Sequence, residues 1–185
     1  RSDALMGAVE GAVVRSRAEL EAGPGLRDLA QLLWAFAKVE AGRPRAVGVL
    51  CRAARRKLRA SLAVPRHRAP PMSPQHITMM VFALGSLGER RVKLAKLLAR
   101  AVRRNLGGFN ARDLTNTAWG FSALRVRWPR LMGRIAGAAC SDLSTFNSQE
   151  LLKLLAALER AGVSHEGLAS AVAAERRTSH DFPAL

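Results

Sequence analysis

The sequence predicts an all-α protein, an α-solenoid of about four helix-turn-helix repeats of 37–48 residues. Four nine-residue segments beginning at Leu29, Ile77, Leu114 and Leu151 align without gaps, and their starts are 48, 37 and 37 residues apart. The apolar residues within them are spaced as on one face of a helix, and no stretch shows the sustained alternation of a strand. A repeat of this period is typical of stacked helical units that share one core.

Each unit is expected to contain two helices, A and B, joined by a short turn. In the second unit the apolar residues from Ile77 to Leu87 fall at i, i+3, i+4, i+7 and i+10, which is the spacing of helix A. Helix B follows, and its residues Leu94, Leu131 and Leu168 are again 37 residues apart. A single pair cannot bury its apolar face alone, so we expect the pairs to stack.

The unit boundaries follow from these alignments. Residues 1–24 are expected to be a partial N-terminal repeat, a lone B helix with Leu5, Val9 and Val13 on one face. The four full units are 25–72, 73–109, 110–146 and 147–182, which together form a four-repeat region over 25–182, and 183–185 are a tail.

Turn and cap residues mark the ends of the helices. We expect A–B turns at Gly42 with Pro44, at Gly85 with Gly88, and at Gly162. Asn110, Asn147 and Ser73 each precede a helix A. Their side-chain oxygens can accept a hydrogen bond from a free N–H group of the first turn.

Most aromatic residues follow the repeat. Trp34 and Trp119 occupy one repeat position, with Phe82 between them, so we expect all three in the core between helices A and B. Trp128 lies in an A–B turn between Arg127 and Pro129, outside this pattern. Stacking on a base and packing against a neighbouring protein remain open for Trp128.

The charge is concentrated in the middle of the chain. The net charge is +16, but residues 43–134 hold 21 Lys and Arg against only Glu89 and Asp113, a local net charge of +19. Such a block predicts a polyanionic partner, and nucleic acid is the first expectation. Arg outnumbers Lys 25 to 5. This ratio fits phosphate recognition by the planar guanidinium group, and it fits a GC-rich genome equally well.

The basic residues also keep the repeat register. Arg45, Lys93 and Arg130 occupy one position at the start of three successive B helices, and Arg90 and Arg127 form a second matched pair. Charged stripes are often only solvated helix faces, but here almost no acidic residue is interleaved. The predicted phosphate-contacting residues are Arg45, Arg52, Arg55, Arg56, Arg59, Arg90, Lys93, Lys96, Arg100, Arg103, Arg127, Arg130 and Arg134.

The sequence offers no catalytic constellation, metal-ligand spacing or Gly-rich phosphate loop, so we expect neither an enzyme nor a cofactor or small-molecule substrate. The four histidines are scattered, and none is near Cys51 or Cys140 in sequence, so both cysteines are expected to be small core residues. No uninterrupted apolar run approaches the roughly 18 residues of a membrane span. The first residue is Arg1 rather than Met, so we expect the chain to be processed or incomplete at its start, and a cleaved targeting peptide is one interpretation of this.

Two segments resemble a known helical repeat. Asp28-Leu29-Ala30-Gln31-Leu32-Leu33-Trp34-Ala35-Phe36-Ala37 and Asp113-Leu114-Thr115-Asn116-Thr117-Ala118-Trp119-Gly120-Phe121 are similar to the helix-A signature of the octotricopeptide repeats, which FASTK-like and RAP-domain proteins share. The second and fourth copies depart from it, since Phe82 and Ala156 replace the Trp. No RAP domain is visible at the C-terminus.

The resemblance implies an organellar RNA-binding protein of the mitochondrion, or alternatively the plastid. In related families polar residues of helix A face the RNA bases. The matching positions here are Gln31, Thr78 or Met79, Asn116 and Lys153. Met79, the apolar candidate in this series, argues against a code in which each repeat recognises one base.

The resemblance and the charge together predict a structural subunit of an organellar ribonucleoprotein. The mitochondrial ribosome is the first expectation, with ribosomal RNA and neighbouring subunits as partners. The first alternative is a free trans-acting factor for the stability, processing or translation of organellar transcripts. The second is a protein-binding scaffold whose basic block meets an acidic protein.

Overall fold

A computed structural model describes residues 2–39, 43–68, 72–124 and 126–178 of the chain. All regular structure in these residues is helical, which confirms the predicted all-α class. The helices are α1 (Ser2–Arg15), α2 (Arg17–Ala22), α3 (Leu26–Lys38), α4 (Pro44–Ala63), α5 (Pro74–Ser86), α6 (Val92–Asn105), α7 (Ala111–Ala123), α8 (Pro129–Cys140), α9 (Ser148–Arg160) and α10 (Glu166–Thr178), with short 3₁₀ helices η1 (Leu106–Gly108) and η2 (Leu143–Thr145).

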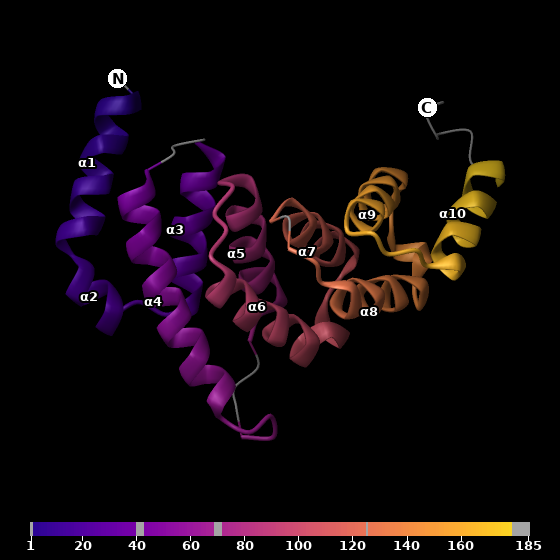
Figure 1. Cartoon of the computed structure of the whole chain (residues 1–185), viewed down its shortest axis with the longest axis horizontal. Helices are drawn as coiled ribbons and strands as arrows, with labels where there is room; N and C mark the ends of the chain where they lie inside the picture. Colours follow the sequence, from indigo (N-terminus) through magenta and orange to yellow (C-terminus); the bar gives the residue numbers. More distant parts are fainter. Residues whose placement is uncertain (1, 40–42, 69–71, 125, 179–185) are drawn as a thin grey trace.

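The helices form two layers (Figure 1). Helices α3, α5, α7 and α9, at the predicted A positions, lie side by side, and each contacts the next. Helices α4, α6 and α8, at the predicted B positions, form the second layer, and α10 packs against α8 and α9. Each A helix also contacts the B helix that follows it in the chain. We call these layers the A layer and the B layer.

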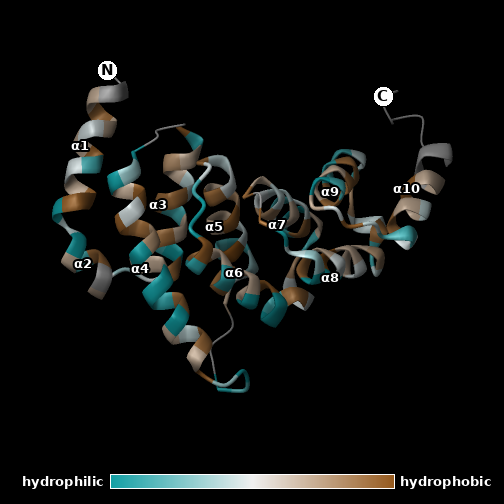
Figure 2. Ribbon diagram, in the orientation of Figure 1, coloured by the Kyte–Doolittle hydropathy of each residue, from teal (hydrophilic) through white to brown (hydrophobic). Residues whose placement is uncertain are grey.

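The core lies between the two layers and runs along the array. Phe36, Leu50, Leu84, Leu98 and Phe121 come from five successive helices, and all are fully buried in one continuous apolar cluster. Figure 2 shows hydrophobic and hydrophilic stretches alternating along most helices, and much of α4 is hydrophilic. Burying one such side chain contributes about 1.5–3 kcal/mol, so the shared core is the main support of the fold.

The N-terminal region differs from the single B helix expected over residues 1–24. It contains two helices, α1 and α2, which are separated at Ser16. Both helices contact α4, the first helix of the B layer. Val13 is buried there, but Leu5 is 65% exposed, so the predicted apolar face does not extend to Leu5.

The predicted caps are found in part. Asn110 and Asn147 precede α7 and α9, and their side chains accept hydrogen bonds from the N–H groups of Asp113 and Glu150. Ser73 occupies the N-cap position of α5, but its side chain makes no capping hydrogen bond. The start of α5 instead has Pro74, whose fixed φ suits the first turn of a helix.

The predicted turn glycines fall into two groups. Gly88 and Gly162 have φ values of +64° and +68°, a conformation that favours glycine, and both follow the end of an A helix. Gly85 does not lie in the turn, because it belongs to α5, where it faces Gly120 of α7. Gly42 and the tail at 183–185 lie outside the described residues.

The absence of Cβ atoms at Gly85 and Gly120 lets α5 and α7 approach closely. A Cβ built on Gly85 would be 2.9 Å from the Cα and carbonyl oxygen of Gly120. Beside this contact, the Thr78 and Thr117 hydroxyl groups form a buried hydrogen bond of 3.1 Å between the same two helices. Gly85 therefore serves the packing of α5 against α7 rather than a turn of the chain.

Candidate nucleic-acid interface

The predicted phosphate-contacting cations are all exposed, and nearly all belong to the B layer or to its turns. Arg52, Arg55, Arg56 and Arg59 lie along α4, and Lys93, Lys96, Arg100 and Arg103 lie along α6. We call these two sets the α4 row and the α6 row. They come together because α4 and α6 are in contact through apolar residues on their opposite faces.

A hollow of about 1010 Å³ lies between the two rows. Both complete rows line it, and Arg17 of α2 joins them. The remaining lining residues are Ala60, Ala63 and Leu97, so its surface consists of cationic groups and aliphatic carbon. We call this hollow the basic groove.

Two smaller hollows extend the basic groove. One, of about 350 Å³, lies at the start of α6 and shares Arg52, Arg55 and Lys93 with the groove. The other, of about 420 Å³, lies near the end of α4 and reaches Arg134 of α8. The three hollows together form a continuous basic surface over α4, α6 and α8.

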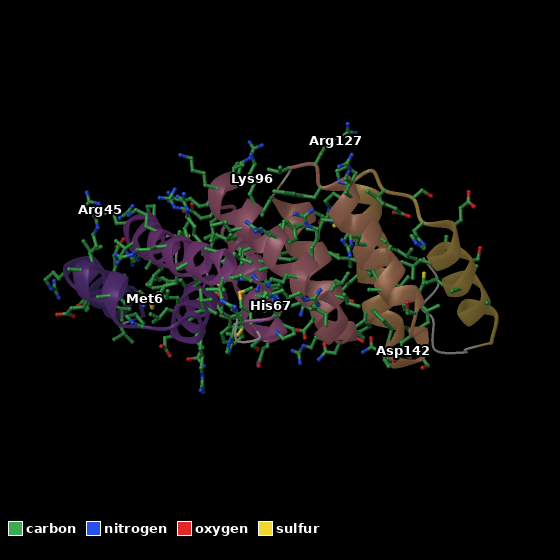
Figure 3. The ribbon with its side chains drawn as sticks, turned by 90° about the horizontal axis from the view of Figure 1, so that it is seen from below. Met6, Arg45, His67, Lys96, Arg127 and Asp142 are labelled. Atoms are coloured by element: carbon green, nitrogen blue, oxygen red, sulfur yellow. The ribbon has the colours of Figure 1, made fainter. Side chains whose placement is uncertain are left out.

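The starts of the B helices add to the positive potential. Arg45, Lys93 and Arg130 are each the second residue of α4, α6 and α8, and none of these helices has an acidic residue in its first turn. Helix N-termini carry a partial positive charge, which makes them suited to bind anions. Figure 3 shows Arg45, Lys96 and Arg127 along one long edge of the molecule.

The acidic residues of the central block do not neutralise this surface. Glu89 accepts a 2.7 Å hydrogen bond from Arg91, and this bond raises the pKa of that guanidinium group. Asp113 lies in the A layer, where burial raises the pKa of its carboxyl group. In the described part of the chain, no carboxylate pairs with Arg52, Arg55, Arg59 or any member of the α6 row.

The structure adds four arginines that the repeat register does not predict, Arg17, Arg66, Arg91 and Arg104. Arg17 and Arg66 line the hollows, although neither occupies a matched repeat position. Arg104 lines the end of the surface, where its guanidinium donates a 2.8 Å hydrogen bond to the Val64 carbonyl beyond the end of α4. Arg104 therefore ties α6 to α4.

The helix-A residues expected to face bases lie on the other layer. Met79, Asn116 and Lys153 line a hollow of about 810 Å³ formed by α3, α5, α7 and α9. We call it the A-layer hollow. Thr78 also contributes to it but is buried and hydrogen-bonded to Thr117, so Met79 is the more accessible of the two candidates. Gln31 is exposed on α3 but does not line the hollow.

The expected core position is wrong for Trp34, and Phe82 and Trp119 are only half-buried. Trp34 is 39% exposed and lines the A-layer hollow, with Lys38 Nζ 5.4 Å from the centre of its ring. Phe82 also lines the hollow, and its ring stacks on half-buried Trp119 with a centroid separation of 4.9 Å. Trp34 differs from Trp119 because α3 is the first helix of its layer, with an A-layer neighbour only in α5.

Trp128 packs into the protein. It is half-buried against the core, and its ring meets Phe121 edge-on at a centroid separation of 5.5 Å. Its indole N–H is buried and has no hydrogen-bond partner in the structure. The sequence left two roles open for Trp128, stacking on a base and packing against a neighbouring protein. The structure supports neither role, because the ring packs against Phe121 of its own chain.

The fold brings one cysteine beside a histidine. Cys140 Sγ is 3.7 Å from His165 Nδ1, although the residues are 25 positions apart. The same nitrogen accepts a 3.2 Å hydrogen bond from the Leu168 N–H in the first turn of α10. We therefore assign His165 a capping role. The described residues contain no group of three His, Cys, Asp or Glu that could hold a metal ion.

We expect the two cysteines to differ in reactivity. Burial raises the pKa of the Cys51 thiol to about 12, so its thiolate is scarce at pH 8, whereas Cys140 is partly exposed. Maleimide at pH 8 should label Cys140 in the native protein and Cys51 only after unfolding, as read by mass spectrometry. Native Cys140→Ser protein should stay unlabelled; rapid labelling of Cys51 would contradict its placement in the core.

No protein-family model matches the chain, and no curated protein matches it significantly. Among the described residues, none of the helices is both long and apolar enough to cross a bilayer. The functional argument therefore depends on the two surfaces described above.

Proposed function

We propose that this protein binds RNA through phosphate contacts on the basic surface of α4, α6 and α8. The observation that carries the proposal is the basic groove, which is lined by two complete rows of cations and, among the described residues, by no carboxylate. Arg and Lys at such density favour a polyanion. Neutralising phosphates releases their counterions, which supplies much of the binding free energy.

We also propose that the helices form an α-solenoid of about four repeats. The support is the pattern of contacts, in which each helix of a layer meets the next and each A helix meets its own B helix. Solenoids bind extended partners along their surface. This arrangement would let the cations of successive units contact successive phosphates.

The proposed setting is an organellar ribonucleoprotein, with the mitochondrial ribosome first and a plastid particle as the alternative. The support is the resemblance of the Trp34 and Trp119 segments to octotricopeptide repeats. The protein would act as a structural subunit that holds ribosomal RNA. Co-sedimentation with ribosomal particles from isolated organelles tests this role, whereas recovery only in free fractions with transcripts would favour a trans-acting factor.

The proposed base-facing residues are Met79, Asn116 and Lys153, with exposed Gln31 beside them on α3. The support is their common location in or near the A-layer hollow. Trp34 and Phe82 in the same hollow offer exposed ring surface, which is the chemistry that stacks on unpaired bases.

We expect the starts of the B helices to contribute to the salt dependence of RNA binding. Arg45→Gln/Arg130→Gln removes two of the cations proposed to pair with phosphates. The slope of log affinity against log salt should become shallower by about 0.7–0.9 for each phosphate that is no longer neutralised. Fluorescence anisotropy with labelled RNA at several salt concentrations measures this slope.

The chain supplies a matched control for this variant. Arg15 and Arg27 are exposed arginines on α1 and α3, outside the B layer, and neither lines any of the hollows described above. Arg15→Gln/Arg27→Gln changes the net charge equally and should leave the slope close to that of the parent. Equal slopes for the two double variants would contradict a specific role for the B-layer starts. A protein that binds an acidic protein but no RNA would instead be a scaffold.

A further inference from the structure

We infer that the basic groove takes double-helical RNA in preference to an unpaired strand. This inference depends on the proposed RNA-binding function, since it specifies which RNA that same surface recognises. Three features of the molecule carry it: the two rows of cations, the side chains that the basic surface lacks, and the location of those side chains in the other layer.

The dimensions of the two rows suit simultaneous contact with the two phosphate backbones of a nucleic-acid duplex. The α4 row runs from Arg52 to Arg59 and the α6 row from Lys93 to Arg103, so at 1.5 Å per residue they are about 10 and 15 Å long. Packed helices have axes about 8–10 Å apart. The rows therefore flank a narrow channel. The major groove of an A-form duplex is also narrow, with a phosphate strand on each side.

The basic surface has few side chains that could recognise nucleic-acid bases. The described residues that line its three hollows include no aromatic side chain and no Asn, Gln, Ser or Thr. An unpaired strand exposes its bases and normally gains affinity when they stack on aromatic rings. A duplex keeps its bases stacked inside and presents phosphates and 2′-hydroxyl groups. A surface of cations and aliphatic carbon therefore matches the duplex better.

The side chains that suit unpaired bases are present, but in the A layer. Trp34 and Phe82 line the A-layer hollow, together with the amides of Asn110, Asn116 and Asn147. The protein thus separates two kinds of chemistry onto two layers. If an unpaired strand were the ligand of the basic groove, its bases would have no partners there.

The same dimensions favour RNA over DNA duplexes. The major groove of B-form DNA is about 12 Å wide and admits a whole helix, whereas the A-form groove is deep and narrow. Two rows on adjacent helices can contact both edges of a narrow groove at once. They match the edges of the wider groove less closely.

The test compares three fluorescent probes of equal phosphate number by anisotropy. The probes are an RNA duplex, an RNA strand without self-complementarity and a DNA duplex of the same sequence. We expect the RNA duplex to bind about tenfold more tightly than either competitor, a difference of about 1.4 kcal/mol. Arg59→Gln/Arg100→Gln, which removes one cation from each row, should weaken duplex binding more than Arg15→Gln/Arg27→Gln.

Each outcome has a separate meaning. Equal or tighter binding of the unpaired RNA would overturn the preference for duplexes and leave the proposed RNA-binding function standing. Equal binding of the DNA duplex would overturn the selection of A-form geometry. Equal weakening of duplex binding in both double variants would remove the groove as the duplex site. Failure to bind any RNA at low salt, by protein with a parental melting temperature, would overturn the proposed function itself.

Discussion

Gly120→Ala is expected to destabilise the protein by about 1–3 kcal/mol, the usual cost of overpacking a well-packed interface. A Cβ at Gly120 would lie 2.7 Å from the Val81 carbonyl oxygen and 2.8 Å from its Cγ1. The Val81 carbonyl belongs to the backbone of α5, so it cannot move aside as the end of a flexible side chain can. The substitution must therefore push α5 and α7 apart or unpack Val81.

A glycine in α8 provides a control for which we expect the opposite change in the free energy of unfolding. Gly137 is also helical, but a Cβ there would meet nothing within 4 Å. Gly137→Ala should stabilise the protein by about 0.5–1 kcal/mol, because alanine loses less backbone entropy in a helix. Urea unfolding followed by circular dichroism measures both changes. Stabilisation by Gly120→Ala as well would mean that α5 and α7 are not in this close contact.

Trp119→Ala is expected to lower the free energy of unfolding by about 3 kcal/mol, the low end of the range for truncated buried tryptophans, because Trp119 is half-buried. Trp119 packs against the core and stacks on Phe82, so the truncation leaves a cavity between α5 and α7 and exposes one face of the Phe82 ring.

Trp34→Ala is the matched comparison, because both residues occupy one repeat position. Trp34 is 39% exposed, so its removal should cost less than about 1 kcal/mol. In a protein of this size each kcal/mol shifts the melting temperature by about 2–4 °C. Thermal melts of the two variants should therefore differ clearly. Equal destabilisation would show that Trp34 is covered as completely as Trp119.

The contrast between these tryptophans shows what local sequence can predict. Helical spacing, the Asn110 and Asn147 caps and the placement of Arg45, Lys93 and Arg130 at helix starts depend on residues close in the chain, and the structure has them as expected. Exposure depends on neighbouring helices as well. The repeat pattern treats Trp34 and Trp119 as equivalent, although α3 has only one neighbour in its layer and α7 has two.

Other features could not be predicted because they join distant parts of the chain. The Gly85–Gly120 contact and the Cys140–His165 pair each bring together residues that are far apart in sequence. Gly85 precedes Gly88 by only three residues, so the sequence suggests that both lie in one turn. Their different roles become visible only when α7 is in place, because Gly85 packs against it and Gly88 does not. The basic groove could not be predicted for the same reason. The repeat register predicts each row of cations, but it does not predict the aliphatic residues Ala60, Ala63 and Leu97 that line the groove with them.

The cationic rows also affect the free protein. Positive groups on α4 and α6 face one another across the groove, whose described lining includes no carboxylate, so the folded state carries unfavourable Coulomb energy before any partner arrives. The apolar contacts beneath the rows hold α4 and α6 together against this repulsion. Salt screens like charges as well as opposite ones. Added salt therefore reduces this repulsion in the unliganded protein, and by the same screening it weakens the binding of phosphate. A bound polyanion would supply counter-charge along both rows.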